Sequence, residues 1–444
     1  MKPIFVKELF RYKLSDIQQI FNCEKELLNS FTNDLIKRKI IEKESSSYKF
    51  AYVGFIQFQG KFIFVMPKFI QEHHFDLYYP TIVKLFKEYN ERENLNIEEV
   101  ETFGDFENEE FYNLFKIVHF LLQDYDENGL YNNDKVEQEL NGDGEIDWNR
   151  SIEQNQSYIS GQNIMYLDFY TQKTISDEED FIRKVHMFVL NQCSSFLKEL
   201  DILDILGFPE VDYNIDFNEL GEEDYILYKI DSEKSNQFLD RKLMLLDALY
   251  YFVSKQNSFK GESKPYLFGT RSFEIIWEKV CSFVFNNEYN KLQKFIPSPV
   301  WKDYNTLKET KRETLIPDIL RKIDVYQLFF VFDAKYYTTT FNENGTLINN
   351  APGISDISKQ YLYEKVFYKY LDIKHYSFYN IFLMPTDGTD ELFGETRFEL
   401  FEALGPIFLL RLNAQKIFSM YSKRERYEEV YFKQLSTALI PYKE

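Results

Sequence analysis

The stretch of residues 315–337, LIPDILRKIDVYQLFFVFDAKYY, most restricts how this chain can fold. Its second half is almost wholly apolar, β-branched or aromatic. That composition predicts a short strand buried on both faces and, with the preceding apolar run, a β-hairpin. Side chains alternate along a strand, so Asp333 and Lys335 are expected on one face. Asp318, which follows a proline at the end of the first apolar run, can face the same pocket.

Such a group of side chains is costly to bury. Two carboxylates that share a pocket repel each other, and apolar neighbours raise the cost of their charge, unless a divalent cation holds them. A lysine beside them could position a water or stabilise the negative charge that develops on a phosphate. The alternative for a lone Asp-x-Lys is a buried ion pair that closes the end of a strand, because buried charges are usually paired.

The whole pattern consists of Pro-Asp at 317–318 and Asp-Ala-Lys at 333–335 on an apolar strand. This arrangement resembles the PD-(D/E)XK nuclease core. The resemblance implies an endonuclease that acts on double-stranded DNA. In such an enzyme Asp318 and Asp333 would hold Mg²⁺ or Mn²⁺, and Lys335 would orient the attacking water or neutralise the scissile phosphate.

Upstream, the segment SFEIIWEKVCSFVF at 272–285 carries apolar residues at helical spacing. Glu274 and Glu278 are four positions apart, so they lie on one face of this helix. Nucleases that resemble this core carry a glutamate on their first helix that completes the metal site. Glu278 is the first choice for that residue and Glu274 the second. A solvated acidic face is the alternative for at least one of them.

Downstream, residues 342–353 are predicted to form a loop by their Asn, Gly and Pro content, and Ser355 is predicted to N-cap the next helix. Gln360 lies in the early turns of that helix. Its position matches one where nucleases of this type often carry a polar residue near the scissile phosphate, although a surface glutamine is the alternative. Residues 376–384 predict a further buried strand, which completes a mixed sheet flanked by helices.

The beginning of the chain predicts a winged-helix-like module. Residues 14–41 carry two short helical patterns, the first with Ser15 as its N-cap. Residues 48–58 and 61–69 then alternate around Gln59-Gly60, as the strands of a hairpin do. Such modules bind DNA or protein, and we favour protein contact.

These patterns predict an α/β multidomain chain with a mixed α+β region between the winged-helix-like module and the nuclease core. Residues 153–258 are expected to be mainly helical. The predicted domains are 1–50, a partner-docking region at 51–258, and the nuclease domain at 259–444.

Three short markers precede the nuclease core in a distinctive order: Val53-Gly54, Pro67-Lys68 and Gly144-Glu145-Ile146-Asp147-Trp148. With that core they resemble the McrC-type family, and more closely its LlaJI-type branch of restriction endonucleases, from about residue 50 to 385. The sequence departs from the pattern at Ser151, where threonine is expected. The resemblance implies a subunit of an antiviral restriction system that works with an McrB-like AAA+ GTPase. This chain has no G-x-x-x-x-G-K-[ST] loop, so the motor would be another polypeptide.

The charge of the chain is unevenly distributed. The net charge is −20, yet residues 260–444 hold 25 Lys and Arg against 24 Asp and Glu, a net of +1. Residues 88–147 hold 19 acidic against 3 basic residues, which predicts a solvated acidic surface or a docking face for a basic partner. A nearly neutral nuclease half predicts weak DNA binding without a partner.

Composition narrows the remaining classes. No apolar run approaches the ~20 residues needed to cross a bilayer, and the N-terminus has no signal-peptide pattern, so we expect a cytoplasmic protein without membrane contact. The three cysteines are dispersed and form no CxxC pair, which argues against structural zinc. The sequence therefore favours a metal-dependent endonuclease subunit. The alternative is a non-catalytic subunit that regulates an AAA+ NTPase.

Overall fold

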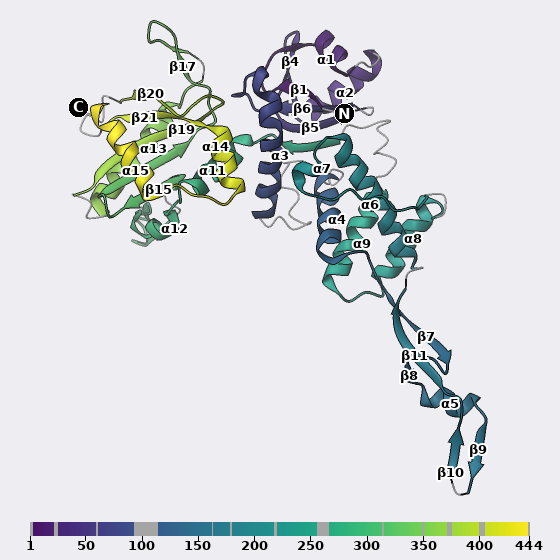
Figure 1. Cartoon of the computed structure of the whole chain (residues 1–444). Helices are drawn as coiled ribbons and strands as arrows, with labels where there is room; N and C mark the ends of the chain where they lie inside the picture. The colour runs from purple at the N-terminus through teal and green to yellow at the C-terminus, as the bar shows by residue number, and fades with distance from the viewer. Residues whose placement is uncertain are drawn as a thin grey trace. The chain divides into compact units, whose positions relative to one another are not determined.

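The computed structural model describes most of the chain and divides it into two compact units. One unit spans residues 113–262, and the other joins residues 2–112 to residues 263–444. Both combine helices and sheets (Figure 1), which confirms the α/β multidomain class. The winged-helix-like and PD-(D/E)XK arrangements, and the domain boundaries after residues 50 and 258, stay predictions. The described residues are 3–21, 25–58, 61–92, 114–161, 163–177, 180–216, 220–254, 266–312, 315–348, 350–370, 375–398 and 405–442.

The N-terminal part of the larger unit contains the two predicted helices and a small antiparallel sheet in the order β2-β4-β3. Its core is formed by buried apolar residues such as Ile17, Leu28, Phe31 and Phe50. Ser15 is not the N-cap, because the first helix begins one residue earlier; instead the carboxylate of Asp16 accepts the backbone N–H of Lys13 at 2.8 Å. The elements are β1 Ile4–Lys7, β2 Tyr12–Lys13, α1 Leu14–Phe21, α2 Lys25–Lys37, β3 Ile41–Glu44 and β4 Ser47–Phe50.

A second sheet of this part has the order β1-β6-β5-β12. The predicted hairpin is present as β5 and β6, but residues 48–58 do not form one strand, because residues up to Phe50 belong to β4 in the other sheet. The predicted turn at Gln59-Gly60 lies outside the described residues. Gly269 faces Gly54 across β12 and β5, where a Cβ on Gly269 would lie 2.0 Å from the carbonyl oxygen of Val53. The strands are β5 Val53–Phe58, β6 Lys61–Met66 and β12 Tyr266–Thr270.

The C-terminal part of the larger unit is built on a five-stranded mixed sheet in the order β15-β16-β19-β21-β20. β15 and β16 form the predicted antiparallel hairpin, and β16 is parallel to β19, which contains the predicted strand at 376–384. β20 and β21 were not predicted. The strands are β15 Ile319–Ile323, β16 Leu328–Ala334, β19 Ser377–Thr386, β20 Glu391–Thr396 and β21 Ile407–Asn413.

Helices cover both faces of this sheet. On one face α13 packs through Tyr363 and Phe367 on Phe329 and Val331. The opposite face is covered by α11, α14 and α15, and the ring of Phe432 in α15 lies 5.6 Å from that of Phe330. Helix α3, from the N-terminal part of the same unit, packs on α14. These helices are α3 Phe75–Arg92, α11 Phe273–Val284, α13 Ile354–Tyr370, α14 Ala414–Ser422 and α15 Glu429–Leu439.

The smaller unit combines a helical bundle with an arm of short strands (Figure 1). Residues 157–176 form three strands, so the expectation of a mainly helical segment from 153 to 258 is wrong for that part. Gly144 allows β8 to approach β11, since a Cβ there would lie 2.3 Å from the carbonyl oxygen of Gln172. The bundle contains α4 Leu114–Asn128, α6 Phe181–Glu199, α7 Leu203–Leu206, α8 Glu223–Lys234 and α9 Asp240–Ser254, and the arm contains β7 Asp134–Leu140, β8 Glu145–Ile146, α5 Trp148–Gln154, β9 Ser157–Ser160, β10 Asn163–Tyr166 and β11 Tyr170–Ser176.

The structure also bears on the predicted lack of membrane contact and on the state of the cysteines. Within the described ranges, no helix is both long and apolar enough to cross a membrane. Cys193 and Cys281 are free and buried, whereas Cys23 lies outside the described residues. Much of the acidic segment at 88–147 also lies outside them, since residues 93–113 are not described.

Candidate active site

The site is organised by the carboxyl end of β16, whose seven residues are all buried. Antiparallel pairing of β15 with β16 places Ile319 opposite Phe332, so Asp318 and Asp333 lie at the same end of the hairpin. Lys335 follows directly after the strand, and its backbone N–H donates to the carbonyl of Leu383 in β19 at 2.8 Å. This bond continues the parallel pairing with β19 and fixes the chain where the lysine leaves the sheet.

The structure brings Asp318, Asp333 and Lys335 together. The Nζ of Lys335 lies 3.1 Å from Oδ2 of Asp333. Oδ2 of Asp318 accepts the backbone N–H of Ala334 at 3.0 Å, and the negative charge of Asp333 acts on the carboxyl group of Asp318. Sequence alternation predicted that Asp333 and Lys335 share a face, and the contact between their charged ends agrees with that prediction.

Burial and like charge perturb these groups in the expected directions. Burial, the interaction with Asp333 and the negative charge of Glu278 together raise the pKa of Asp318 to about 9. For Lys335, burial alone would lower the pKa, but the charges of Asp333 and Asp356 outweigh it, so the pKa is raised. The site therefore retains a proton on a carboxyl group beside a charged lysine at neutral pH.

Of the two glutamates of α11, Glu278 lies nearer to this pair of aspartates. Burial raises the pKa of Glu278, the charge of Lys335 lowers it and the charge of Asp333 raises it again. The charge of Glu278 also acts on Asp318. Glu274 is exposed, and its charge acts on Lys68 from the N-terminal part of the unit. This placement favours Glu278 over Glu274 as the acidic residue of the helix that serves the site.

Helix α13 contributes Asp356, Gln360 and Tyr363 to the site, at spacings of four and three residues. Only Gln360 was predicted from the sequence as a site residue. Gln360 is fully buried, and neither atom of its side-chain amide has a hydrogen-bond partner among the described residues. Asp356 accepts a hydrogen bond from Nζ of Lys335 at 3.0 Å. The phenol of Tyr363 donates to the carbonyl of Ile316 at 3.0 Å, and its pKa is raised by burial and by the charges of Asp333 and Asp318.

Asp356 also corrects the predicted helix cap. Helix α13 begins at Ile354, so Ser355 lies inside it and is not the N-cap. The carboxylate of Asp356 instead accepts the backbone N–H of Gly353 at 3.1 Å. One oxygen of Asp356 therefore holds the helix end and the other holds Lys335. The stripe of polar residues at helical spacing was the signal in the sequence that could have identified Asp356.

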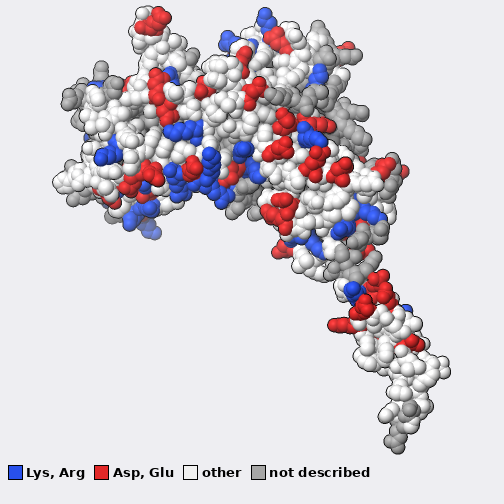
Figure 2. Space-filling view, viewed as in Figure 1, with Lys and Arg blue, Asp and Glu red and all other residues white. Residues whose placement is uncertain are grey.

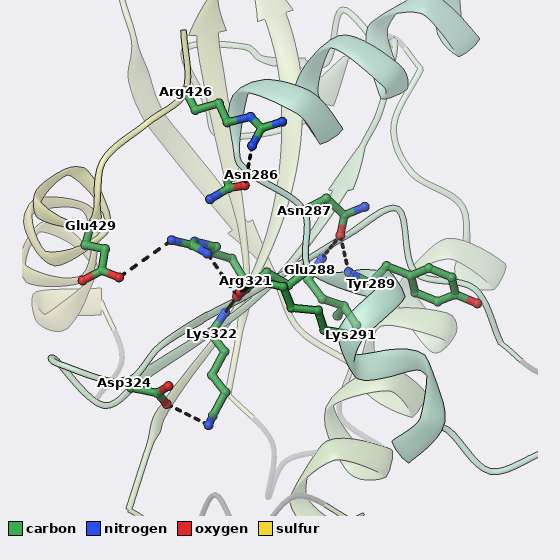
Figure 3. Close-up of polar contacts among 11 residues, drawn as sticks. Asn286, Asn287, Glu288, Tyr289, Lys291, Arg321, Lys322, Asp324, Arg426 and Glu429 are labelled. Carbon is green, nitrogen blue, oxygen red and sulfur yellow. Dashed lines mark hydrogen bonds and ion pairs between the residues drawn. The ribbon is translucent and has the colours of Figure 1, made fainter. Parts of the chain in front are cut away.

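The free edge of β15 is held by the segment that follows α11 (Figure 3). The side-chain amide of Asn287 donates to the carbonyl of Asp318 at 2.8 Å and accepts the N–H of Leu320 at 3.0 Å. The next residue, Glu288, accepts the N–H of Lys322 at 3.0 Å and pairs with Nη1 of Arg321 at 3.1 Å. Asn287 and Glu288 thus pair with the edge strand as a neighbouring strand would, and they fix the backbone that carries Asp318.

A buried polar contact connects the residue after Lys335 to the N-terminal part of the unit. The phenol of Tyr336 and the backbone N–H of Lys68 both donate to Oε2 of Glu8. The Nζ of Lys68 lies 4.1 Å from the centre of the Tyr336 ring. Burial raises the pKa of Glu8, and the charge of Lys68 lowers it. The Pro67-Lys68 marker therefore has a structural role, because it packs on the strand end that carries Lys335.

The predicted metal site requires acidic side chains that lie close together. In the part of the chain that the structure describes, no group of three or more His, Cys, Asp or Glu side chains is close enough to hold a metal ion. Asp318 and Asp333 nonetheless offer hard oxygen ligands of the kind that Mg²⁺ and Mn²⁺ prefer. The raised pKa of Asp318 means that its negative charge is unfavourable in this pocket, and a bound cation would offset that cost. The chemistry of Asp318 and Asp333 therefore fits a divalent metal, whereas Glu278 does not complete a group of three acids with them in this structure.

Comparison with known proteins agrees with the resemblance stated above. The sequence model of the LlaJI restriction endonuclease family matches residues 52–415. A curated relative, the Type II restriction enzyme BsuMI component YdjA of Bacillus subtilis (strain 168), is 28% identical over 409 residues, which are 88% of this chain and 85% of the relative.

Two solved structures are similar at low identity. One is a half-complex of Thermococcus gammatolerans McrB AAA+ hexamers with bound McrC, with a TM-score of 0.41 and 13% identity over 95% of this chain and 99% of that one. The other is the McrBC complex of the same organism, with a TM-score of 0.26 and 12% identity over 57% and 80% of the two chains. Because the family match spans most of the chain, the protein belongs to the LlaJI restriction endonuclease family and is a nuclease-type component of a restriction system.

Proposed function

We propose that this chain is the DNA-cleaving subunit of its restriction system and that it hydrolyses phosphodiester bonds with a divalent metal. The observation that carries the proposal is the placement of Asp318 and Asp333 at one end of the hairpin, with Nζ of Lys335 3.1 Å from Oδ2 of Asp333. Asp318, Asp333 and Glu278 would hold Mg²⁺ or Mn²⁺. A bound divalent cation supplies charge stabilisation for the phosphate and lowers the pKa of a coordinated water.

Side chains of the protein would stabilise the charge on the phosphate and position the attacking water. Lys335 carries a positive charge at neutral pH, because its pKa is raised, and it can neutralise charge that develops on the scissile phosphate or orient the attacking water. Asp356 holds the ammonium group at 3.0 Å and so limits where it can point. The amide of Gln360 is a positioned donor and acceptor for a phosphate oxygen or water, since it has no partner among the described residues.

The test compares substitutions in the site with one in the same hairpin. Asp318→Asn, Asp333→Asn and Lys335→Met are each expected to lower the rate of Mg²⁺-dependent DNA cleavage by at least about 100-fold, the usual effect of removing a central group. Asp324→Asn is the matched control, because Asp324 is an exposed aspartate in the turn between β15 and β16. Cleavage by Asp333→Asn at the rate of the unchanged protein would contradict the assignment. A folded protein that never cleaves DNA would favour the non-catalytic, regulatory alternative.

The glutamate choice needs its own comparison. We expect Glu278→Gln to lose cleavage and Glu274→Gln to retain it, because only Glu278 exchanges electrostatic interactions with Asp318, Asp333 and Lys335. Equal activity of both variants would remove α11 from the site. Equal loss would indicate that Glu274 acts through its neighbour.

We further propose that the subunit works with a separate McrB-like AAA+ GTPase. The chain has no phosphate-binding loop of its own, and the curated relative is by name one component of a restriction enzyme. The arm of the smaller unit is suited to a protein partner, because residues 154–167 contain no Asp, Glu, Lys or Arg, and the described residues at that end of the arm are white in Figure 2. Ile159 and Ile164, which face each other across β9 and β10, are 80% and 66% exposed.

Exposed apolar side chains on two short strands are typical of a surface that a partner covers. The arm also carries acidic residues nearer the bundle, so encounter with a basic ring should weaken as salt increases. The test uses the full chain with Asp333→Asn and measures GTP hydrolysis by the motor. Ile159→Ser with Ile164→Ser should abolish stimulation, whereas Phe238→Ser with Leu239→Ser, at positions that are 90% and 61% exposed outside the arm, should not. Absence of any binding or stimulation at low salt would contradict the partnership.

A further inference from the structure

A small hairpin precedes the candidate active site and belongs to no larger sheet. Strands β13 (Val300–Lys302) and β14 (Glu309–Lys311) pair only with each other, and every residue of both is exposed. The turn between them is ordered by Asp303, whose carboxylate accepts bonds from the N–H of Asn305 at 2.9 Å and the hydroxyl of Thr306 at 2.6 Å. The hairpin is therefore a defined element that contributes nothing to the core.

Its composition differs from that of an ordinary solvated loop. Trp301 is 63% exposed, Tyr304 86% and Leu307 70%. Residues 300–312 also contain four basic and two acidic residues, a net of +2 in a chain whose net charge is −20. Large exposed aromatics cost free energy in water, so the hairpin has the character of a binding surface for a polyanion with stackable or apolar groups.

The two faces of the ribbon are unlike. Trp301 pairs with Thr310, and alternation places Lys308 and Arg312 on the same face, one on either side of Thr310. The hydrogen bonds from Asp303 to Lys308 and from Arg312 to Pro299 extend the ladder over those positions. Within the described residues, no carboxylate pairs with Lys308 or Arg312, and both are exposed.

The positive charge on the other face of the ribbon is partly neutralised. Lys302 and Glu309 are directly opposite each other, and Nζ of Lys302 lies 3.5 Å from Oε1 of Glu309. Lys311 lies on that face by alternation. The free positive charge that accompanies the indole is therefore concentrated on the Trp301 face.

We propose that this face of the β13–β14 ribbon binds double-stranded DNA beside the cleavage site, with Lys308 and Arg312 on phosphates and Trp301 against the bases or sugars of the groove. A two-stranded ribbon has the dimensions that the major groove admits. Arg312 precedes Asp318 by six residues, which span at most about 20 Å, so duplex held by the ribbon lies within reach of the two aspartates. This inference rests on the proposed function, and it names the element that presents the substrate.

The experiment measures DNA affinity of the full chain, with Asp333→Asn to prevent cleavage, over a salt series with a labelled duplex. Lys308→Ala with Arg312→Ala should weaken binding about 30-fold at 0.15 M salt and reduce the salt slope by about 1.8, the values for two lost phosphate contacts. Lys302→Ala with Lys311→Ala removes the same charge from the opposite face, and it should change affinity less than about threefold, because Lys302 already faces Glu309.

The aromatic contribution has its own control. Trp301→Ala should weaken binding roughly tenfold without changing the salt slope. Trp148→Ala, which removes a tryptophan that is 55% exposed in the smaller unit, should leave affinity unchanged. All four positions of the charge comparison and both tryptophans are exposed, so these variants should keep their fold, which circular dichroism checks.

The outcomes separate this inference from the proposed function. Equal weakening by the two double variants would overturn the ribbon proposal, because it would mean that only overall charge matters. Unchanged binding by Trp301→Ala and by both double variants, in a protein that still cleaves DNA, would also overturn it and leave the nuclease function standing. If the Asp333→Asn chain does not bind duplex at low salt, and the unchanged chain does not cleave DNA with Mg²⁺ even together with the motor, both proposals are overturned.

Discussion

Asp318 provides a test of the candidate site that needs neither a partner nor a known DNA sequence. Its pKa is raised to about 9, far above the ordinary value of about 4. The folded protein therefore binds this proton more tightly than the unfolded chain does. A group of this kind contributes stability that is fully present below pH ~4 and is lost as the pH rises through the folded pKa.

The expected loss of stability follows from the pH range between the unfolded and the folded pKa of Asp318. Between pH 5 and pH 8 the contribution changes by at most about 1.4 kcal/mol per pH unit, which bounds the loss at about 4 kcal/mol. Asp333 and solvent share the effect, so we expect a loss of about 1–4 kcal/mol in metal-free protein. Asp318→Asn cannot ionise, and its side-chain oxygen can still accept the N–H of Ala334. This variant should lose that pH dependence and be the more stable protein at pH 8.

The assay is urea unfolding in the presence of EDTA at pH 5, 6, 7 and 8, followed by the fluorescence of buried tryptophan. Trp277 is fully buried in the same unit, and its indole donates to the carbonyl of Leu383 at 3.1 Å. Asp324→Asn is the control. Its partners Lys322 and Tyr376 lower the pKa of Asp324, so its contribution is already complete above pH ~4 and should not vary over this range. Parallel pH profiles for the unchanged protein and Asp318→Asn would refute the reasoning.

Three further predictions concern the residues that support the site. Asp356→Asn should lower the pKa of Lys335, because one of its two nearby negative charges is removed, and the basic limb of the pH profile for cleavage should move to lower pH. Glu8→Ala should cost about 1–3 kcal/mol in urea unfolding, because it leaves the buried phenol of Tyr336 without its acceptor, whereas Glu8→Gln should cost less than about 1 kcal/mol. Asn287→Ala should lower the unfolding free energy by about 1–3 kcal/mol and reduce cleavage, because it leaves the carbonyl of Asp318 and the N–H of Leu320 unpaired. Unchanged values of both would contradict the role of Asn287 in holding this edge of the sheet.

Local patterns predicted the elements that carry the site. The apolar run before Asp333 is a buried strand, as its composition indicates, and the helical spacing in 272–285 is that of α11. Such patterns depend on neighbours within a few residues, and the backbone period converts them directly into a face or a strand. The same local rules were wrong at the helix ends near Ser15 and Ser355, because each helix begins one residue before the serine and an aspartate in its first turn accepts the backbone N–H of the residue before the helix.

The partners of the site residues were decided by tertiary structure. Lys335 pairs with Asp356 at a separation of 21 residues, Asn287 reaches Asp318 across 31, and Tyr336 meets Glu8 across 328. No periodicity relates residues so far apart, because which side chains meet depends on how helices and sheets pack. The sequence by itself determined that two aspartates and a lysine stand at the end of a buried strand. The packing of α11, α13 and the N-terminal strands around that end decided which groups contact Asp318, Asp333 and Lys335. The same packing decided that Asp318 keeps a proton.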